Sequence, residues 1–207
     1  MSELHAAGKP LDEAQAAMIL IHGRGASAAS ILRLAEELYH PGFAYLAPQA
    51  DDLSWYPLPF LAPLEENEPA LSAALDTVAA VLDQVIDAGL PAENVILAGF
   101  SQGACLSAEF LARRAQRLGG LIVFSGGLIG PPGTPRDYTG SLAGTPVLIG
   151  CGDTDPHIPG ERVDETAAVL TALGGVVDKH IYPGMGHMIN ADEIEQARLI
   201  VETVGNG

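Results

Sequence analysis

Residues 95–103, VILAGFSQG, decide the expected fold of this 207-residue chain. The first four residues are all apolar, which is typical of a central strand buried on both faces. Gly99 and Gly103 flank Ser101, and a helical pattern runs over residues 102–117. Such glycines let a strand and a helix approach each other without a Cβ clash. The stretch therefore predicts a strand, a sharp turn that exposes the serine, and a helix.

Short apolar runs alternate with longer helical segments along the rest of the chain. The further expected strands cover residues 17–21, 43–46, 120–124, 147–150 and 176–182. The further expected helices cover residues 30–39, 71–88, 160–173 and 191–204. This alternation predicts an α/β fold with a mostly parallel central sheet and helices on both faces. We expect a single domain over residues 1–207, with no room for a large cap domain.

Two long irregular segments, residues 48–69 and 125–146, interrupt this pattern. Loops of this length in a compact domain are more often functional than idle. The first of them concentrates large apolar side chains in a proline-rich stretch, and the candidate substrate contacts there are Trp55, Tyr56, Phe60 and Leu61. These side chains either line an acyl pocket or form a satellite core.

The charge balance limits the classes of partner. The chain has 10 Lys and Arg against 26 Asp and Glu, a formal net charge of −16. Nucleic acids and anionic membrane surfaces require a basic footprint, so neither is an expected partner. No apolar run reaches the roughly 20 residues of a membrane-spanning helix. Residues 1–10 contain no apolar run of the signal-peptide type.

The two cysteines, Cys105 and Cys151, lie in apolar surroundings without metal-ligand spacing. We expect both to be reduced and buried, in a cytoplasmic protein. The histidines and carboxylates form no cluster with ligand spacing either. We therefore expect no metal and no cofactor.

A serine hydroxyl needs a neighbouring base before it acts as a nucleophile. Among the six histidines, His187 stands in the turn PGMGH that follows the last expected strand. The carboxyl ends of parallel strands collect at one edge of the sheet, where Ser101 is also expected. His22 ends the first strand and is expected to brace a loop, whereas His5 lies in an expected tail. The pattern therefore favours His187 as the general base for Ser101.

An acid that orients the histidine is expected in residues 152–156, GDTDP, just past another strand. Asp153 and Asp155 are both available there, and periodicity does not separate them. One of the two is expected to cap the turn. The chain order of serine, acid and histidine matches the order typical of hydrolases with this strand–turn–helix nucleophile.

Together these motifs resemble the small carboxylesterase/phospholipase branch of the α/β-hydrolases, which includes the acyl-protein thioesterases. The matching blocks are residues 20–25, LIHGRG; 99–103, GFSQG; 152–159, GDTDPHIP; and 184–187, GMGH. The resemblance implies the α/β-hydrolase fold and selects Asp155 as the catalytic acid, beside Ser101 and His187. It also implies that the backbone N–H groups of Arg24 and Gln102 form the oxyanion hole.

Arg24 departs from the better-known members of that branch, which usually carry an apolar residue at this position. Its guanidinium is expected to pair either with a nearby Asp or Glu of the acidic surface or with an anionic group of the substrate. The second alternative leaves the identity of the substrate more open than the identity of the three catalytic residues.

The expected function is that of a serine carboxylesterase acting on small or short-to-medium acyl esters, with thioesters and lysophospholipids as further candidates. The expected partner is a small-molecule ester, and the expected assembly is a monomer or a homodimer. A dienelactone-hydrolase-like lactonase is an alternative, although such enzymes usually carry cysteine where this chain has Ser101. A ligand-binding relative without turnover is the alternative from another functional class.

Overall fold

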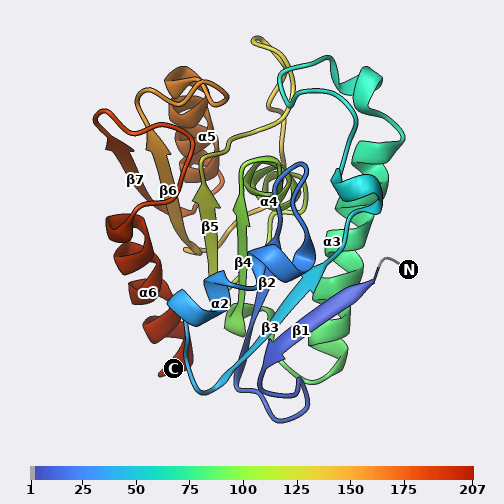
Figure 1. Ribbon diagram of the computed structural model, residues 1–207, viewed down its shortest axis with the longest axis vertical. Helices are drawn as coiled ribbons and strands as arrows, with labels where there is room; N and C mark the ends of the chain where they lie inside the picture. Colours follow the sequence, from blue (N-terminus) through green and yellow to red (C-terminus); the bar gives the residue numbers. More distant parts are fainter. Residues whose placement is uncertain (1–2) are drawn as a thin grey trace.

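A computed structural model describes residues 3–207 and contains one seven-stranded sheet (Figure 1). The strands are β1 (Leu4–Gly8), β2 (Ala16–Ile21), β3 (Phe43–Pro48), β4 (Val95–Phe100), β5 (Gly120–Phe124), β6 (Pro146–Gly152) and β7 (Val176–Tyr182). Their order across the sheet is β1-β3-β2-β4-β5-β6-β7. Only β1 pairs antiparallel with its neighbour, and the other pairs are parallel. The expected mostly parallel sheet is confirmed.

Helices cover both faces of this sheet, as predicted. The helices are α1 (Ala28–Ile31), α2 (Leu34–Glu37), α3 (Ala70–Asp87), α4 (Gln102–Arg113), α5 (Gly160–Ala172) and α6 (Ala191–Gly205). Short 3-10 helices form η1 (Asp51–Leu53), η2 (Leu64–Asn67) and η3 (Ala92–Asn94). Side chains of α3, α4 and α5 share one apolar core with one face of the sheet, and those of α1, α2 and α6 share a second core with the other face.

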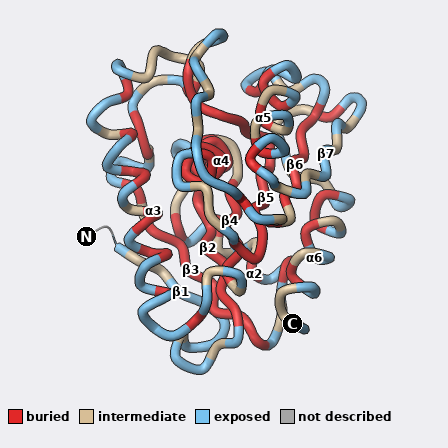
Figure 2. Tube along the Cα trace, turned by 180° about the vertical axis from the view of Figure 1, so that it is seen from behind, coloured by how far each residue is buried: buried red, intermediate tan, exposed pale blue. Residues whose placement is uncertain are grey.

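The five inner strands β3, β2, β4, β5 and β6 are almost entirely buried between the two layers, whereas the edge strands β1 and β7 are largely exposed (Figure 2). Helix α4 is equally enclosed, and its residues from Gln102 to Ala112 are all buried. A helix with so little exposed surface has no polar face, so its sequence lacks a clear end signal. The predicted end of this helix was residue 117. The helix instead ends at Arg113, because Arg114 leaves the helical conformation. Cys105 and Cys151 are free and buried, as expected.

Two further elements differ from the prediction. Residues 4–8 were expected as a tail but form the edge strand β1, which pairs with β3. Leu4 lies opposite Pro48 at one end of this pairing, and Gly8 lies opposite Ala44 at the other. Its sequence LHAAG has no alternation of apolar and polar residues, so nothing local indicates a strand. The single helix expected over residues 30–39 is divided into α1 and α2, each four residues long.

Close backbone contact at the turn after β4 requires its two glycines. A Cβ on Gly103 would lie 2.1 Å from the carbonyl oxygen of Ile21 in β2. A Cβ on Gly99 would lie 2.4 Å from the backbone of Gly103. These distances are far below van der Waals contact, and the facing atoms are main chain that cannot rotate away. The turn between β4 and α4 therefore keeps its shape only with glycine at both positions.

We predict that Gly103→Ala lowers the free energy of unfolding by about 3 kcal/mol, because a buried methyl group must push β2 and α4 apart. Gly160→Ala is the matched control. A Cβ at Gly160 meets no atom within 4 Å, and the position lies in the first turn of α5. Alanine there raises helix propensity and leaves stability unchanged or increases it by up to about 1 kcal/mol. Urea unfolding of both variants tests the difference, and equal effects would contradict it.

Candidate active site

Ser101 occupies the turn between β4 and α4 in a strained conformation. Its φ of 58° and ψ of −120° lie in a region that residues other than glycine rarely adopt. The backbone holds it there, since the Ser101 N–H donates to the Phe124 carbonyl at 3.0 Å and the Cys105 N–H donates to the Ser101 carbonyl at 3.0 Å. The side chain thus stands beside the N-terminus of α4, where backbone N–H groups favour negative charge.

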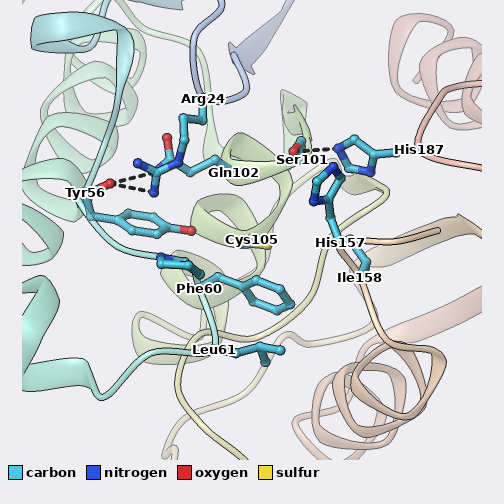
Figure 3. A pocket seen from close by; sticks show the side chains of 11 residues that line it. Arg24, Tyr56, Phe60, Leu61, Ser101, Gln102, Cys105, His157, Ile158 and His187 are labelled. Atoms are coloured by element: carbon cyan, nitrogen blue, oxygen red, sulfur yellow. Dashed lines mark hydrogen bonds between the residues drawn. The ribbon is translucent and has the colours of Figure 1, made fainter.

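The three predicted catalytic side chains meet at the carboxyl ends of β4, β6 and β7. Ser101 Oγ lies 2.8 Å from His187 Nε2, and His187 Nδ1 lies 2.7 Å from Asp155 Oδ2. The Asp155 side chain is fully buried, whereas the His187 side chain is 17% exposed. Residues 86 positions apart in the chain therefore form one hydrogen-bonded series. Figure 3 shows the serine end of this series at the edge of a pocket.

Hydrogen bonds keep Asp155 ionised despite its burial. Burial by itself raises the pKa of this carboxyl group, but the hydrogen bonds from His187 and from the N–H groups of His157 and Ile158 outweigh it, and the pKa lies below its usual value. The two N–H groups donate to Oδ1 at 2.8 and 3.1 Å. An ionised Asp155 only accepts, so Nδ1 of His187 carries the proton and Nε2 presents a lone pair to Ser101.

The geometry distinguishes the two aspartates that the residue pattern left open. Asp153 does not contact His187, and its Oδ1 accepts a hydrogen bond from the Gly184 N–H at 2.6 Å. It is therefore the turn cap, and it holds the segment that carries His187. Gly184 itself has a φ of 72°, which a glycine adopts without strain.

Aromatic rings enclose His187 on two sides. Phe100 packs against it with ring centroids 4.9 Å apart, and His157 packs edge-on at 4.8 Å. His157 was not among the predicted site residues, although it lies two positions after the acid. Its place in the block GDTDPHIP is the signal that indicates it, because a residue so close to the acid must lie near the base.

His22 braces a loop, as predicted. It is fully buried, its Nε2 accepts a hydrogen bond from the Ala50 N–H at 3.1 Å, and its Nδ1 lies 2.8 Å from the Gly23 carbonyl. Burial lowers its pKa, which favours the neutral ring. The indole of Trp55 packs on this ring and donates through Nε1 to the His22 carbonyl at 2.8 Å.

The pocket beside Ser101 has a volume of about 460 Å³. Its lining consists of Arg24, Tyr56, Pro59, Phe60, Leu61, Ser101, Gln102, Cys105, His157, Ile158 and His187. Of the four candidate substrate contacts, Tyr56, Phe60 and Leu61 line this pocket, and their role in binding stays a prediction. Trp55 is not among the lining residues and is buried against His22, which corresponds to the satellite-core alternative. Pro59, Cys105 and Ile158 are lining residues that the sequence analysis did not select.

The side chains of Arg24 and Gln102 both form hydrogen bonds to the segment of residues 54–58. We call these contacts the clasp. The same two residues are expected to supply the oxyanion hole through their backbone N–H groups. The Arg24 guanidinium donates to three successive carbonyls, those of Tyr56, Pro57 and Leu58, at 2.9, 2.8 and 2.7 Å. Figure 3 shows the first of these bonds, to Tyr56. The expectation that an Asp or Glu pairs with Arg24 is wrong, since these carbonyls take that place.

Gln102 holds the same segment through further hydrogen bonds. Its side-chain amide donates to the Tyr56 carbonyl at 2.9 Å and accepts from the Trp55 N–H at 3.1 Å. A further bond joins the Gly25 N–H to the Leu53 carbonyl at 2.8 Å. The two loops that bear the expected oxyanion donors are thus fixed to one wall of the pocket.

A buried carboxylate on α4 fixes the second long loop. Glu109 is 1% exposed, and it accepts hydrogen bonds from the Ile129 N–H at 3.0 Å, from the Tyr138 hydroxyl at 3.0 Å and from Arg113 Nε at 2.6 Å. The neighbouring Gly130 N–H then donates to the carbonyl of Phe60 at 2.7 Å. The loop over residues 125–146 therefore supports the wall to which Phe60 belongs.

Within residues 3–207, no group of three or more His, Cys, Asp or Glu side chains is arranged to hold a metal ion. None of the helices in this described part has both the length and the apolar character required to span a bilayer.

Residues 4–204 match the model of the Phospholipase/Carboxylesterase family. The chain belongs to this family. A family member from Dyadobacter fermentans, solved as a phospholipase/carboxylesterase, is 40% identical and superposes with a TM-score of 0.94 over 98% of this chain and 97% of that one. The seven-stranded architecture is therefore the α/β-hydrolase fold of the family.

Curated relatives within this esterase family are more distant. A probable carboxylesterase SOBER1-like protein of Arabidopsis thaliana is 30% identical over 69% of this chain and 55% of its own. An acyl-protein thioesterase 1 of Gibberella zeae is 34% identical over 56% of this chain and 50% of its own. The chain thus spans about half the length of the curated relatives it matches.

A second buried carboxylate, Glu193, lies behind the strand that leads to Asp155. It is fully buried at the start of α6, and its Oε2 accepts from the Asn190 N–H at 2.8 Å. Within the described residues its Oε1 has no hydrogen-bond partner. Burial above all, and to a lesser extent the nearby Asp192, raises the pKa of Glu193 to about 7, against the opposing effects of the Asn190 N–H and His180.

This raised pKa predicts that the stability of the fold depends on pH. Between its ordinary value of 4.5 and about 7 the folded chain binds more protons at Glu193 than the unfolded chain, so stability falls as the pH rises through this window. Glu193→Gln removes the titration. The free energy of unfolding of this variant minus that of the wild type is therefore expected to be about 2 kcal/mol larger at pH 8 than at pH 5. Exposed Glu195 on the same helix provides the control Glu195→Gln, and chemical unfolding at both pH values measures the gap. A gap independent of pH would contradict the prediction.

Proposed function

We propose that the protein is a serine esterase that hydrolyses small or short-to-medium acyl esters through an acyl-enzyme. The observation that carries the proposal is the series from Ser101 Oγ through His187 to Asp155, with contacts of 2.8 and 2.7 Å beside a pocket. Activated nucleophiles are recognised by such a geometry of nucleophile, base and orienting acid. Membership of the Phospholipase/Carboxylesterase family supports ester cleavage as the class of reaction.

In the first half-reaction, Ser101 Oγ attacks the acyl carbonyl while His187 Nε2 accepts the serine proton. The carbonyl π bond opens, and the oxyanion that forms accepts hydrogen bonds from the backbone N–H groups of Arg24 and Gln102. Asp155 stabilises the imidazolium through Nδ1. Collapse restores the carbonyl and breaks the bond to the leaving group, which departs with the proton from His187. The product at this stage is an alcohol or a thiol and an acyl-serine.

In the second half-reaction, a water molecule attacks the acyl-serine and His187 accepts its proton. The second tetrahedral intermediate uses the same two N–H groups. Its collapse returns the proton to Ser101 Oγ and releases the carboxylic acid. One base thus serves both halves, and no cofactor is required.

Oxygen esters, thioesters and lysophospholipids all fit this sequence of steps. The relative from Gibberella zeae is named an acyl-protein thioesterase, which makes thioesters the natural second class to assay. A lactonase of the dienelactone-hydrolase type fits less well, since this chain carries serine at position 101.

The mechanism predicts that Ser101→Ala lowers kcat/KM for a p-nitrophenyl ester by at least about four orders of magnitude. The melting temperature should stay near that of the wild type, because the hydroxyl contributes little to packing. Stoichiometric labelling of the wild type by a fluorophosphonate, and none of the variant, provides an independent measurement. Retained turnover in Ser101→Ala would reject the proposed nucleophile.

A paired substitution tests the acid. Asp155→Asn is expected to reduce kcat by about three to four orders of magnitude, because an amide does not hold the tautomer that leaves Nε2 free to accept a proton. Asp153→Asn alters only a cap on the exposed turn and is expected to reduce kcat by at most about tenfold. Steady-state kinetics on one ester compare the two. Equal losses would show that Asp155 has no special role.

A further inference from the structure

The pocket beside Ser101 differs in charge from the rest of the molecule. The chain carries a formal net charge of −16, with 26 acidic residues. None of the residues that line this pocket is an Asp or a Glu, and one of them is Arg24. Asp155 lies behind His187 and does not itself line the pocket. This difference in charge affects which substrates the pocket attracts.

Among the described residues 3–207, Arg24 forms no ion pair with a carboxylate, unlike most arginines of the chain. Ion pairs with Asp or Glu neutralise five others, namely Arg113, Arg114, Arg136, Arg162 and Arg198. Arg24 instead donates to three backbone carbonyls. Carbonyl dipoles satisfy its N–H groups but do not cancel its unit charge. Its guanidinium therefore keeps a net positive charge at the pocket.

Donor groups also remain free at this wall. A guanidinium has five N–H groups, and the three carbonyls occupy three of them, which leaves two. The ring of Tyr56 lies 5.9 Å from the Arg24 guanidinium carbon, and its buried hydroxyl points toward Cys105 (Figure 3). The two unused N–H groups of Arg24, which carry an unneutralised charge, match a ligand rich in acceptor oxygens.

We propose that the ester substrate carries a negatively charged group, a carboxylate or a phosphate, and that Arg24 attracts this group to the pocket. This inference rests on the proposed esterase function and specifies its substrate class. The same clasp that orders the wall at residues 56–58 also holds the guanidinium in place, so little side-chain entropy is lost when the anion binds. Because Arg24 is exposed, solvent screens the attraction and limits its size.

Matched esters and matched variants test this proposal. The neutral ester is p-nitrophenyl hexanoate. Mono-p-nitrophenyl adipate carries the anion on the acyl side, and 4-nitro-3-(hexanoyloxy)benzoic acid carries it on the leaving-group side. The variants are Arg24→Gln, Arg24→Lys and the control Arg33→Gln. Arg33 is an exposed arginine outside this pocket, so the control removes the same charge elsewhere.

The measured quantity is the ratio of kcat/KM for an anionic ester to kcat/KM for the neutral ester. Arg24→Gln is expected to lower this ratio about fivefold for at least one anionic ester, mainly through KM. Arg24→Lys keeps the charge and preserves most of the ratio, even where the weaker clasp reduces all rates. Arg33→Gln leaves the ratio unchanged. In the wild type, added sodium chloride lowers the ratio by screening.

Equal loss on neutral and anionic esters in Arg24→Gln, with no effect of salt on the wild-type ratio, would overturn the proposal and leave Arg24 as a brace alone. That result differs from failure of the esterase function itself, in which the wild type hydrolyses none of the three esters. The ester whose ratio changes identifies the side of the scissile bond that carries the anion.

Discussion

Backbone contact between the turn at residues 99–103 and strand β2 constrains the whole active site. Gly103 approaches the Ile21 carbonyl so closely that a methyl group would lie 2.1 Å from it. This approach sets α4 directly against the sheet and forces Ser101 into its strained conformation. It also sets Ser101, the proposed nucleophile, beside the loop after β2, where Arg24 stands. One steric requirement thus orients both the hydroxyl and the first of the two loops around it.

The parts of this arrangement that the sequence predicted are those with strong local signals. Strands β5 and β7 have the predicted bounds, and the serine turn and the turn before His187 carry glycines that local geometry requires. The choice between Asp153 and Asp155 needed a family resemblance, because both follow the same strand and only their partners differ. Strand β1 was missed because LHAAG gains its order from pairing with β3, which no local pattern records.

The errors at the pocket have a tertiary cause. Trp55 and Phe60 are both large aromatic residues of the same loop. The indole of Trp55 nevertheless lies inside the fold, because its N–H donates to the His22 carbonyl. Arg24 was expected to pair either with a carboxylate of the acidic surface or with an anionic substrate group, but three carbonyls of a loop more than thirty residues away lie within reach. Neither outcome depends on neighbours in sequence, so composition and periodicity do not reveal it.

The hydrogen bonds of Arg24 and Gln102 to residues 56–58 all end on main-chain carbonyls, and the Arg24 guanidinium also lies over the Tyr56 ring. Exchange of the side chains of residues 56–58 for others therefore leaves every one of these hydrogen bonds intact. During evolution the pocket wall is free to change its chemical character while the proposed oxyanion loops keep their geometry. Substrate range and catalytic competence are separable traits in such an architecture, and diversification requires no compensating change at the nucleophile.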